Sequence, residues 1–358
     1  ANKHIIDINQ NVAARSLAVD FSRNSLFIGD VEGNVSAMHL SDSTTIDIPN
    51  DVNVSSSDPI LAMVVDVYGV AWAATECTLH YLLPAQGSNW NSLGFCTGTD
   101  TETPTEMLVV DRQLFVATES HGVHNINYST TSNGATNQIE IDSNTIWDSN
   151  NHLSGDSIVD IAIANDILYV ATSDSGIDRF DISSTSWLGS WSSANWLSSD
   201  NVVGLSTTPG WLHILEEDKV HAYDTDVLLF RSVTPLSDFG LTGTATSITA
   251  WPGGATRSPA TSTALVGDSS GTLGRMSEDS SDGTMVVVSS PSIEDAEIVA
   301  IIDDGEMGEF WIASGSEINF MDRRQSLWKE PFDLADEVSN PGSITCPSVR
   351  RWWGSRDY

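Results

Sequence analysis

The sequence predicts an all-β protein: a seven-bladed β-propeller with four-stranded antiparallel blades around a central channel. Three observations predict it. A short apolar core recurs seven times, successive copies start 43 to 54 residues apart, and no window carries apolar residues at helical spacing. One propeller blade, with four short strands and their turns, needs a repeat of this length. The copies start at Phe27, Trp72, Phe115, Tyr169, His213, Leu265 and Trp311.

The copies share an order of side chains, as in Tyr169-Val170-Ala171-Thr172: large, aliphatic, usually Ala or Gly, then polar. Both faces of such a strand need cover, which neighbouring blades supply. Burying each large first residue is worth about 1.5–3 kcal/mol. An apolar run before each core, such as Leu61–Val65, predicts the innermost strand. Glycines after the core, such as Gly122 and Gly176, predict a tight turn into a third strand.

The predicted propeller spans residues 1–332, and residues 333–358 form a tail without the repeat. Residues 4–8 have no repeat of their own, and we expect them to join the last blade and close the ring. The tail ends in an arginine- and tryptophan-rich stretch, residues 350–358, for which two hypotheses stand: docking to a partner, or packing on the acidic propeller. Two independent β-sandwich domains are the alternative architecture, but they would not explain seven copies of the apolar core in phase.

The charge is strongly acidic, with 49 Asp and Glu against 15 Lys and Arg and a net charge of −34. Such a surface repels phosphate backbones, so we expect no nucleic-acid partner. It also keeps molecules apart unless salt shortens the screening length to about 8 Å or less, which suits saline surroundings. No run of 18 apolar residues is present, so we expect no transmembrane segment.

Cys77 and Cys96 flank a predicted hairpin and fall opposite each other on its two strands. A disulfide there would stabilise the fold by about 3 kcal/mol on the chain-entropy model and would indicate an oxidising compartment. Two buried free thiols are the alternative. If the bridge forms, the third cysteine, Cys346, is left over.

Two consecutive repeat units, the fourth and the fifth, share a motif that is longer than the apolar core. Residues 151–162 lead to Leu168–Thr172 and Gly176–Asp181, and residues 195–205 repeat the beginning. This resembles the two-component-regulator propeller repeat, which is found in extracytoplasmic sensor regions and in stand-alone secreted propellers. The resemblance implies a secreted, periplasmic or cell-surface location. Its motifs are structural, so it supports the fold rather than an activity. Sensor members continue into membrane and kinase segments, which these residues do not include.

The segments that enter the innermost strands should gather at one mouth of the channel, where loops on a rigid scaffold carry function. The acidic residues of these entering segments would form a ring that attracts a cation or a hydroxylated ligand. The alternative is that Asp and Asn cap the turns before these strands. The ligand-binding candidates are Arg15, Asp58, Asp156, Asp200, Asn201 and Glu297.

No catalytic residue is assigned, because the nucleophile-elbow, zinc-protease and phosphate-loop motifs are absent and the eight histidines lack metal spacing. No cofactor is predicted. Acidic turns such as Asp303–Glu306 offer oxygens to a structural or site cation such as calcium, but without EF-hand spacing. Tryptophans beside the outer strands, Trp187, Trp191 and Trp196 among them, either stack on sugars or wedge between blades.

The sequence thus favours a non-catalytic extracytoplasmic propeller that serves as a binding or scaffolding module for a protein, glycan or surface partner. The alternative is a propeller enzyme, a hydrolase or lyase, with a cation-assisted site at the channel mouth. Neither the ligand nor the oligomeric state follows from the residues.

Overall fold

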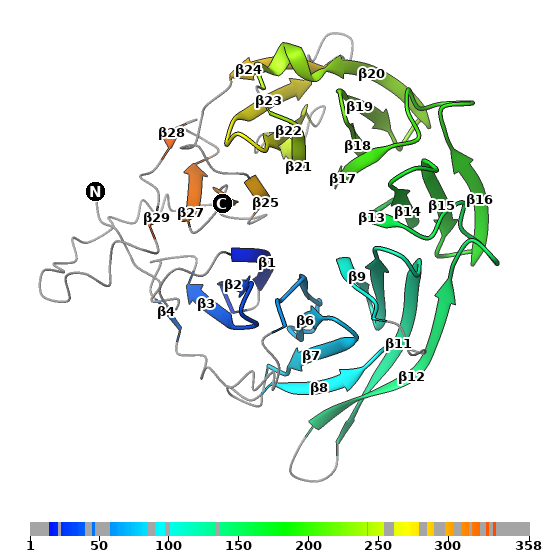
Figure 1. The fold of residues 1–358 in the computed structure, drawn as a ribbon, viewed down its shortest axis with the longest axis vertical. Helices are drawn as coiled ribbons and strands as arrows, with labels where there is room; N and C mark the ends of the chain where they lie inside the picture. The colour runs from blue at the N-terminus through cyan, green and yellow to red at the C-terminus, as the bar shows by residue number, and fades with distance from the viewer. Residues whose placement is uncertain are drawn as a thin grey trace, which may run out of the picture.

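The computed structural model is a ring of antiparallel sheets around a central axis (Figure 1). It describes residues 14–20, 23–39, 45–46, 58–84, 90–96, 101–132, 137–241, 243–253, 261–278, 285–289, 298–303, 309–314, 317–322, 327–328 and 332–333. In each sheet the strands follow one another in chain order, so every blade is an antiparallel meander.

The first three blades have the following strands. β1 (Ala14–Asp20), β2 (Ser25–Asp30), β3 (Val35–His39) and β4 (Thr45–Ile46) form one. β5 (Ala62–Val65), β6 (Ala71–Thr75), β7 (Thr78–Leu82) and β8 (Asn91–Gly94) form the next. β9 (Pro104–Val110), β10 (Gln113–Thr118), β11 (Val123–Ser132) and β12 (Asn137–Trp147) follow.

The remaining sheets continue the pattern. β13 (Ile158–Ala164), β14 (Ile167–Thr172), β15 (Ile177–Asp181) and β16 (Ser186–Trp191) precede β17 (Val202–Thr208), β18 (Trp211–Glu216), β19 (Lys219–Asp224) and β20 (Leu229–Pro235). The short 3-10 helix η1 (Leu236–Phe239) leads to β21 (Ala245–Gly253), β22 (Thr261–Asp268), β23 (Leu273–Glu278) and β24 (Met285–Ser289). The last sheet contains β25 (Ile298–Asp303), β26 (Glu309–Ser314), β27 (Glu317–Asp322), β28 (Leu327–Trp328) and β29 (Phe332–Asp333).

The prediction of seven four-stranded blades is wrong, because the described residues form six four-stranded blades. The last sheet instead has five strands, since β28 and β29 pair with different ends of β27. Pro331 stands between these two short pieces in the sequence, and proline has no N–H to donate to a ladder. Residues 4–8 and the tail from residue 334 lie outside the described residues.

The innermost strands surround the axis in the order β1, β5, β9, β13, β17, β21 and β25, and β25 also packs beside β1 (Figure 1). The recurring apolar core lies in the second strand of each sheet, as predicted. Its large first residues are fully or almost fully buried at Phe27, Trp72, Phe115, Tyr169, His213 and Leu265. The clusters that contain them combine residues of neighbouring sheets, so each blade covers the next.

A disulfide joins Cys77, at the turn before β7, to Cys96, just after β8. The two Cα atoms are 5.0 Å apart, within the usual range for the bond. This is the pairing that the hairpin argument weighed against two free thiols. Within the described part of the chain, no helix has the length and apolar character that crossing a membrane requires.

Candidate functional site

The segments that enter the innermost strands lie beside the turns that follow the second strands, and together they form what we call the entry face. Three of the predicted candidates occupy equivalent places there. The N–H of Gly122 donates to the Asp156 carbonyl, and that of Gly176 donates to the Asp200 carbonyl, each at 2.9 Å. The Asp58 carbonyl likewise lies against Gly33. These aspartates therefore sit where one blade is fastened to the next.

The side chains of Asp156 and Asp200 are engaged inside their own loops. Asp156 accepts hydrogen bonds from the N–H and Oγ of Ser149 at 2.6 and 2.7 Å. Asp200 accepts the same pair of bonds from Ser193 at 2.6 and 2.8 Å. This is the capping arrangement that was the alternative to a ligand site. Whether either carboxylate also binds a ligand stays a prediction.

The other predicted candidates are not drawn into one cluster. Arg15 is exposed on β1, and Asn201 is exposed just before β17, where its N–H donates to Ser199 Oγ at 3.0 Å. Glu297 lies outside the described residues. No group of three or more His, Cys, Asp or Glu side chains that suits a metal ion occurs in the part of the chain that the structure describes.

Buried polar pairs also hold the entry loops. His221 Nε2 lies 2.9 Å from Glu216 Oε1, and both side chains are buried. The same carboxylate oxygen accepts the N–H of Ser198 at 2.9 Å. Two blades earlier in the ring, His124 pairs with Glu102 of the loop that leads into β9. These histidines act in packing and in fastening loops.

The tryptophans differ in their burial, and two of them have the predicted role of wedges between blades. Trp191 is buried and packs on Tyr169 of its own blade and Tyr223 of the next, with ring centroids 5.5 and 4.6 Å away. Trp187 packs on Trp147 of the preceding blade. Both are wedges between blades. Trp196 differs, because it is 58% exposed and lies flat on Phe230.

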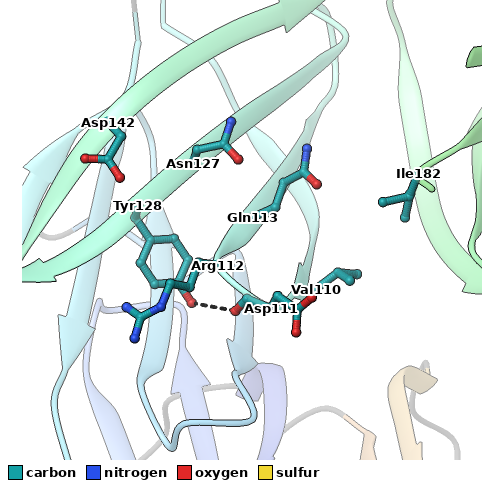
Figure 2. A pocket seen from close by; sticks show the side chains of 8 residues that line it. All are labelled: Val110, Asp111, Arg112, Gln113, Asn127, Tyr128, Asp142 and Ile182. Atoms are coloured by element: carbon teal, nitrogen blue, oxygen red, sulfur yellow. Dashed lines mark hydrogen bonds between the residues drawn. The ribbon is translucent and has the colours of Figure 1, made fainter. Parts of the chain in front are cut away.

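Sequence reasoning missed an open pocket of about 380 Å³ on the other side of the ring. Here lie the turns between the innermost and second strands and those between the third and outer strands, a side that we call the opposite face. Most of the pocket belongs to the β9–β12 blade, and Ile182 contributes from the turn after β15 (Figure 2). Its lining residues are Val110, Asp111, Arg112, Gln113, Asn127, Tyr128, Asp142 and Ile182.

The floor of the pocket is fixed by Tyr128, whose side chain is almost completely buried. Its hydroxyl donates to Asp66 Oδ2 at 2.6 Å and lies 3.4 Å from the Asp111 carbonyl oxygen (Figure 2). Burial, followed by the hydrogen bond and negative charge of Asp66, raises the pKa of the Tyr128 phenol. Tyr128 therefore remains a neutral donor and ties the pocket to the β5–β8 blade.

A β-bulge places one carboxylate in the pocket. The β11–β12 register shifts between Asn127 and Tyr128, which leaves Asp142 as the extra residue of β12. Bulges re-aim side chains and often lie beside functional sites. The carboxylate accepts a hydrogen bond from Ser129 Oγ at 3.0 Å. The bulge therefore directs an acidic group to the pocket wall without interrupting the blade.

Amide and guanidinium groups line the rest of the pocket. Asn127 Nδ2 donates to Ser143 Oγ at 2.9 Å, and Gln113 Nε2 donates to Asn125 Oδ1 at 2.7 Å. The Arg112 guanidinium lies over the ring of Tyr68, 4.8 Å from its centroid. Cross-strand bonds thus hold the amides, and the pocket combines two carboxylates, two amides and one cation.

Two further carboxylates lie on neighbouring innermost strands, Glu106 on β9 and Asp160 on β13. Burial, and then the negative charge of Asp160, raises the pKa of the Glu106 carboxyl. Burial also raises the pKa of Asp160, against the hydrogen bonds that it accepts from the N–H groups of Leu205 and Ile161. Since two interacting carboxylates resist double ionisation, this pair is able to hold a proton near the axis.

Solved structures share the fold at low sequence identity. The extracellular domain of a hybrid two-component system from B. thetaiotaomicron matches with a TM-score of 0.62 and 13% identity, over 98% of this chain and 43% of that one. The computationally designed Ika8 protein matches with a TM-score of 0.54 and 12% identity, over 88% and 97% of the two chains. Virginiamycin B lyase from Staphylococcus aureus matches with a TM-score of 0.59 and 13% identity, over 86% and 93%.

These likenesses show the β-propeller fold, and this chain spans less than half of that extracellular domain. They agree at that coarse level with the resemblance found in residues 151–205. No family model and no curated protein matches the chain.

Proposed function

We propose that this protein is a non-catalytic binding module whose ligand is a hydroxyl-rich molecule, such as a sugar unit of a glycan, held in the pocket of the β9–β12 blade. The observation that carries the proposal is the pocket itself, which combines Asp111, Asp142, Asn127, Gln113 and Arg112 in about 380 Å³. Small-molecule sites commonly measure about 300–1,000 Å³.

The lining favours a ligand that donates hydrogen bonds. Carboxylates only accept when ionised, and each amide presents a carbonyl oxygen as well as its N–H groups. Sugar hydroxyls donate and accept, so they can satisfy both the oxygens and the Arg112 guanidinium. A phosphate or carboxylate ligand would meet repulsion from Asp111 and Asp142. The proposed binding involves no cofactor.

We place this function outside the cytoplasm, in a secreted, periplasmic or cell-surface protein. The disulfide between Cys77 and Cys96 supports this location, because such bonds persist in oxidising compartments. The fold shared with an extracellular domain is consistent with it.

A second candidate function is acid–base catalysis near the axis, as a hydrolase or lyase would require. The observation in its favour is the Glu106 and Asp160 pair with raised pKa values, since perturbed carboxylates concentrate at functional sites. The hydrogen bond that Asp160 accepts from the N–H of Leu205 on β17 equally joins two blades, so we rank this candidate second.

The test is binding to a printed panel of neutral and amino sugars, followed by calorimetric titration of the best ligand. We expect Asp142→Asn to weaken binding about tenfold or more, since a hydrogen bond to a charged group is worth about 1.5–3 kcal/mol. Asn127→Ala removes a neutral partner worth about 0.5–1.5 kcal/mol and should weaken binding by up to about tenfold. Asp200→Asn removes a carboxylate from the entry face instead of from the pocket, so it should leave the affinity unchanged. Addition of a chelator should also leave it unchanged.

The opposite pattern, with binding lost in Asp200→Asn and kept in Asp142→Asn, would transfer the site to the entry face. Mass spectrometry of the bound sugar after long incubation tests the second candidate. A cleaved or unsaturated product that disappears with Glu106→Gln would make this protein an enzyme.

A further inference from the structure

The turn between β19 and β20 presents three consecutive apolar side chains to solvent. Val227, Leu228 and Leu229 are 58%, 64% and 48% exposed. Single exposed apolar residues are ordinary on protein surfaces, whereas grouped ones indicate interaction sites. We call these three residues the apolar turn.

The neighbouring blade contains the same turn with polar residues. Asp181 Oδ1 accepts the N–H of Ser184 at 3.0 Å, and Asp224 Oδ1 accepts the N–H of Val227 at 3.1 Å. The left-handed residue is Thr185 with φ 51° in one turn and Leu228 with φ 58° in the other. Ser184, Thr185 and Ser186 thus correspond to the three residues of the apolar turn, so the turn geometry does not require apolar side chains.

The apolar turn is held on a fixed base. Asn165 Nδ2, from the β13–β16 blade, donates to the Thr225 carbonyl at 3.1 Å and to Asp226 Oδ1 at 3.0 Å. Arg231 binds Asp224 Oδ2 through Nε and a terminal nitrogen at 3.1 and 2.9 Å. A preorganised surface of this kind loses little conformational freedom on binding.

The border of the apolar turn is acidic. Asp226 precedes it in the chain, and Asp166 follows Asn165, the residue that anchors it; both aspartates are exposed. The whole chain carries a net charge of −34. Charge complementarity therefore selects a basic partner and disfavours both a second copy of this chain and an anionic lipid surface.

We propose that the apolar turn is a docking surface for another protein, through a segment that combines apolar side chains with lysine or arginine. The apolar side chains of the partner would cover Val227, Leu228 and Leu229, and its cations would face Asp226 and Asp166. This surface is separate from the sugar-binding pocket and does not depend on it.

The experiment uses a fluorescent model peptide of alternating leucine and lysine, and fluorescence anisotropy reports its binding. The variant V227S/L228T/L229S copies the residues of the neighbouring turn, so we expect it to fold and to bind the peptide at least about tenfold more weakly. The matched control is Val67→Ser, which removes a side chain that is 77% exposed on another turn. It should bind as the wild type does.

Equal affinity of the wild type and the triple variant would overturn the proposal, since acidic attraction alone would then explain binding. Two other measurements test whether a membrane or a second copy of this chain binds the apolar turn instead. Co-sedimentation with zwitterionic vesicles that the triple variant loses would make the apolar turn a membrane contact. A dimer in sedimentation velocity that the triple variant loses would make it a contact between copies.

Discussion

The two faces of the propeller use the same residue types for different purposes. On the entry face, Asp156 and Asp200 accept hydrogen bonds from serines of their own loops, and their carbonyls receive glycine N–H groups of the preceding blade. On the opposite face, Asp142 lines a pocket. The carboxylates of Asp156 and Asp200 each accept two bonds inside their own loops, whereas Asp142 accepts one bond, from Ser129 Oγ, and also faces a pocket where a ligand can reach it.

The two faces also differ in their covalent and buried polar cross-links and in the apolar side chains that they expose. The entry face is closed by the Cys77–Cys96 disulfide and by the buried pairs of Glu102 with His124 and Glu216 with His221. The opposite face presents Tyr68 and the apolar turn to solvent. Changes on the entry face should therefore cost stability, and changes on the opposite face should cost binding.

The largest expected effect on stability is that of Gly176→Ala on the entry face. Gly176 has φ +88°, and an added Cβ would overlap the Trp191 carbonyl oxygen of the backbone. Left-handed strain costs about 1–2 kcal/mol, and overpacking adds about 1–3 kcal/mol. We expect urea unfolding to report a loss of about 3 kcal/mol or more.

Gly189→Ala is the matched control for this change. Gly189 has φ +83°, but no atom lies within 4 Å of the added Cβ. Only the strain of about 1–2 kcal/mol should remain. Equal losses in the two variants would mean that close contact between blades at the entry face contributes little.

Loss of the disulfide should follow in size. The bond closes a loop with a sequence separation of 19, for which the chain-entropy model gives about 3 kcal/mol. We expect the double variant C77S/C96S to unfold at a lower urea concentration while its affinity for the pocket ligand is unchanged. A loss of affinity in this variant would show that the two faces are coupled.

The smallest effect should be a gain in stability on the opposite face. Leu228→Gly relieves the left-handed strain at φ 58° and should raise the free energy of unfolding by about 1 kcal/mol, since the leucine side chain is mostly exposed. The same change should weaken binding of the leucine–lysine peptide. A destabilised Leu228→Gly variant would indicate that this side chain supports the fold instead.

Sequence reasoning located the elements that local patterns specify. The repeated cores, as in Tyr169–Thr172, became second strands because each large side chain needs burial on both sides. It misjudged the last sheet, where the outer strand is split on either side of Pro331 into β28 and β29. Its ligand candidates lie on the entry face, where Asp156 and Asp200 cap their own loops and ligand binding stays a prediction.

The sequence by itself determined the repeat, the glycine turns at Gly122 and Gly176, and the opposed cysteines, because each depends on residues close together in the chain. Tertiary structure alone decided where the pocket lies, since it brings Asp111 and Asp142 together with Ile182 of the next blade. The bulge at Asp142 depends on the register between two strands. No local pattern records that register, so no reading of the residues in order could have placed this carboxylate.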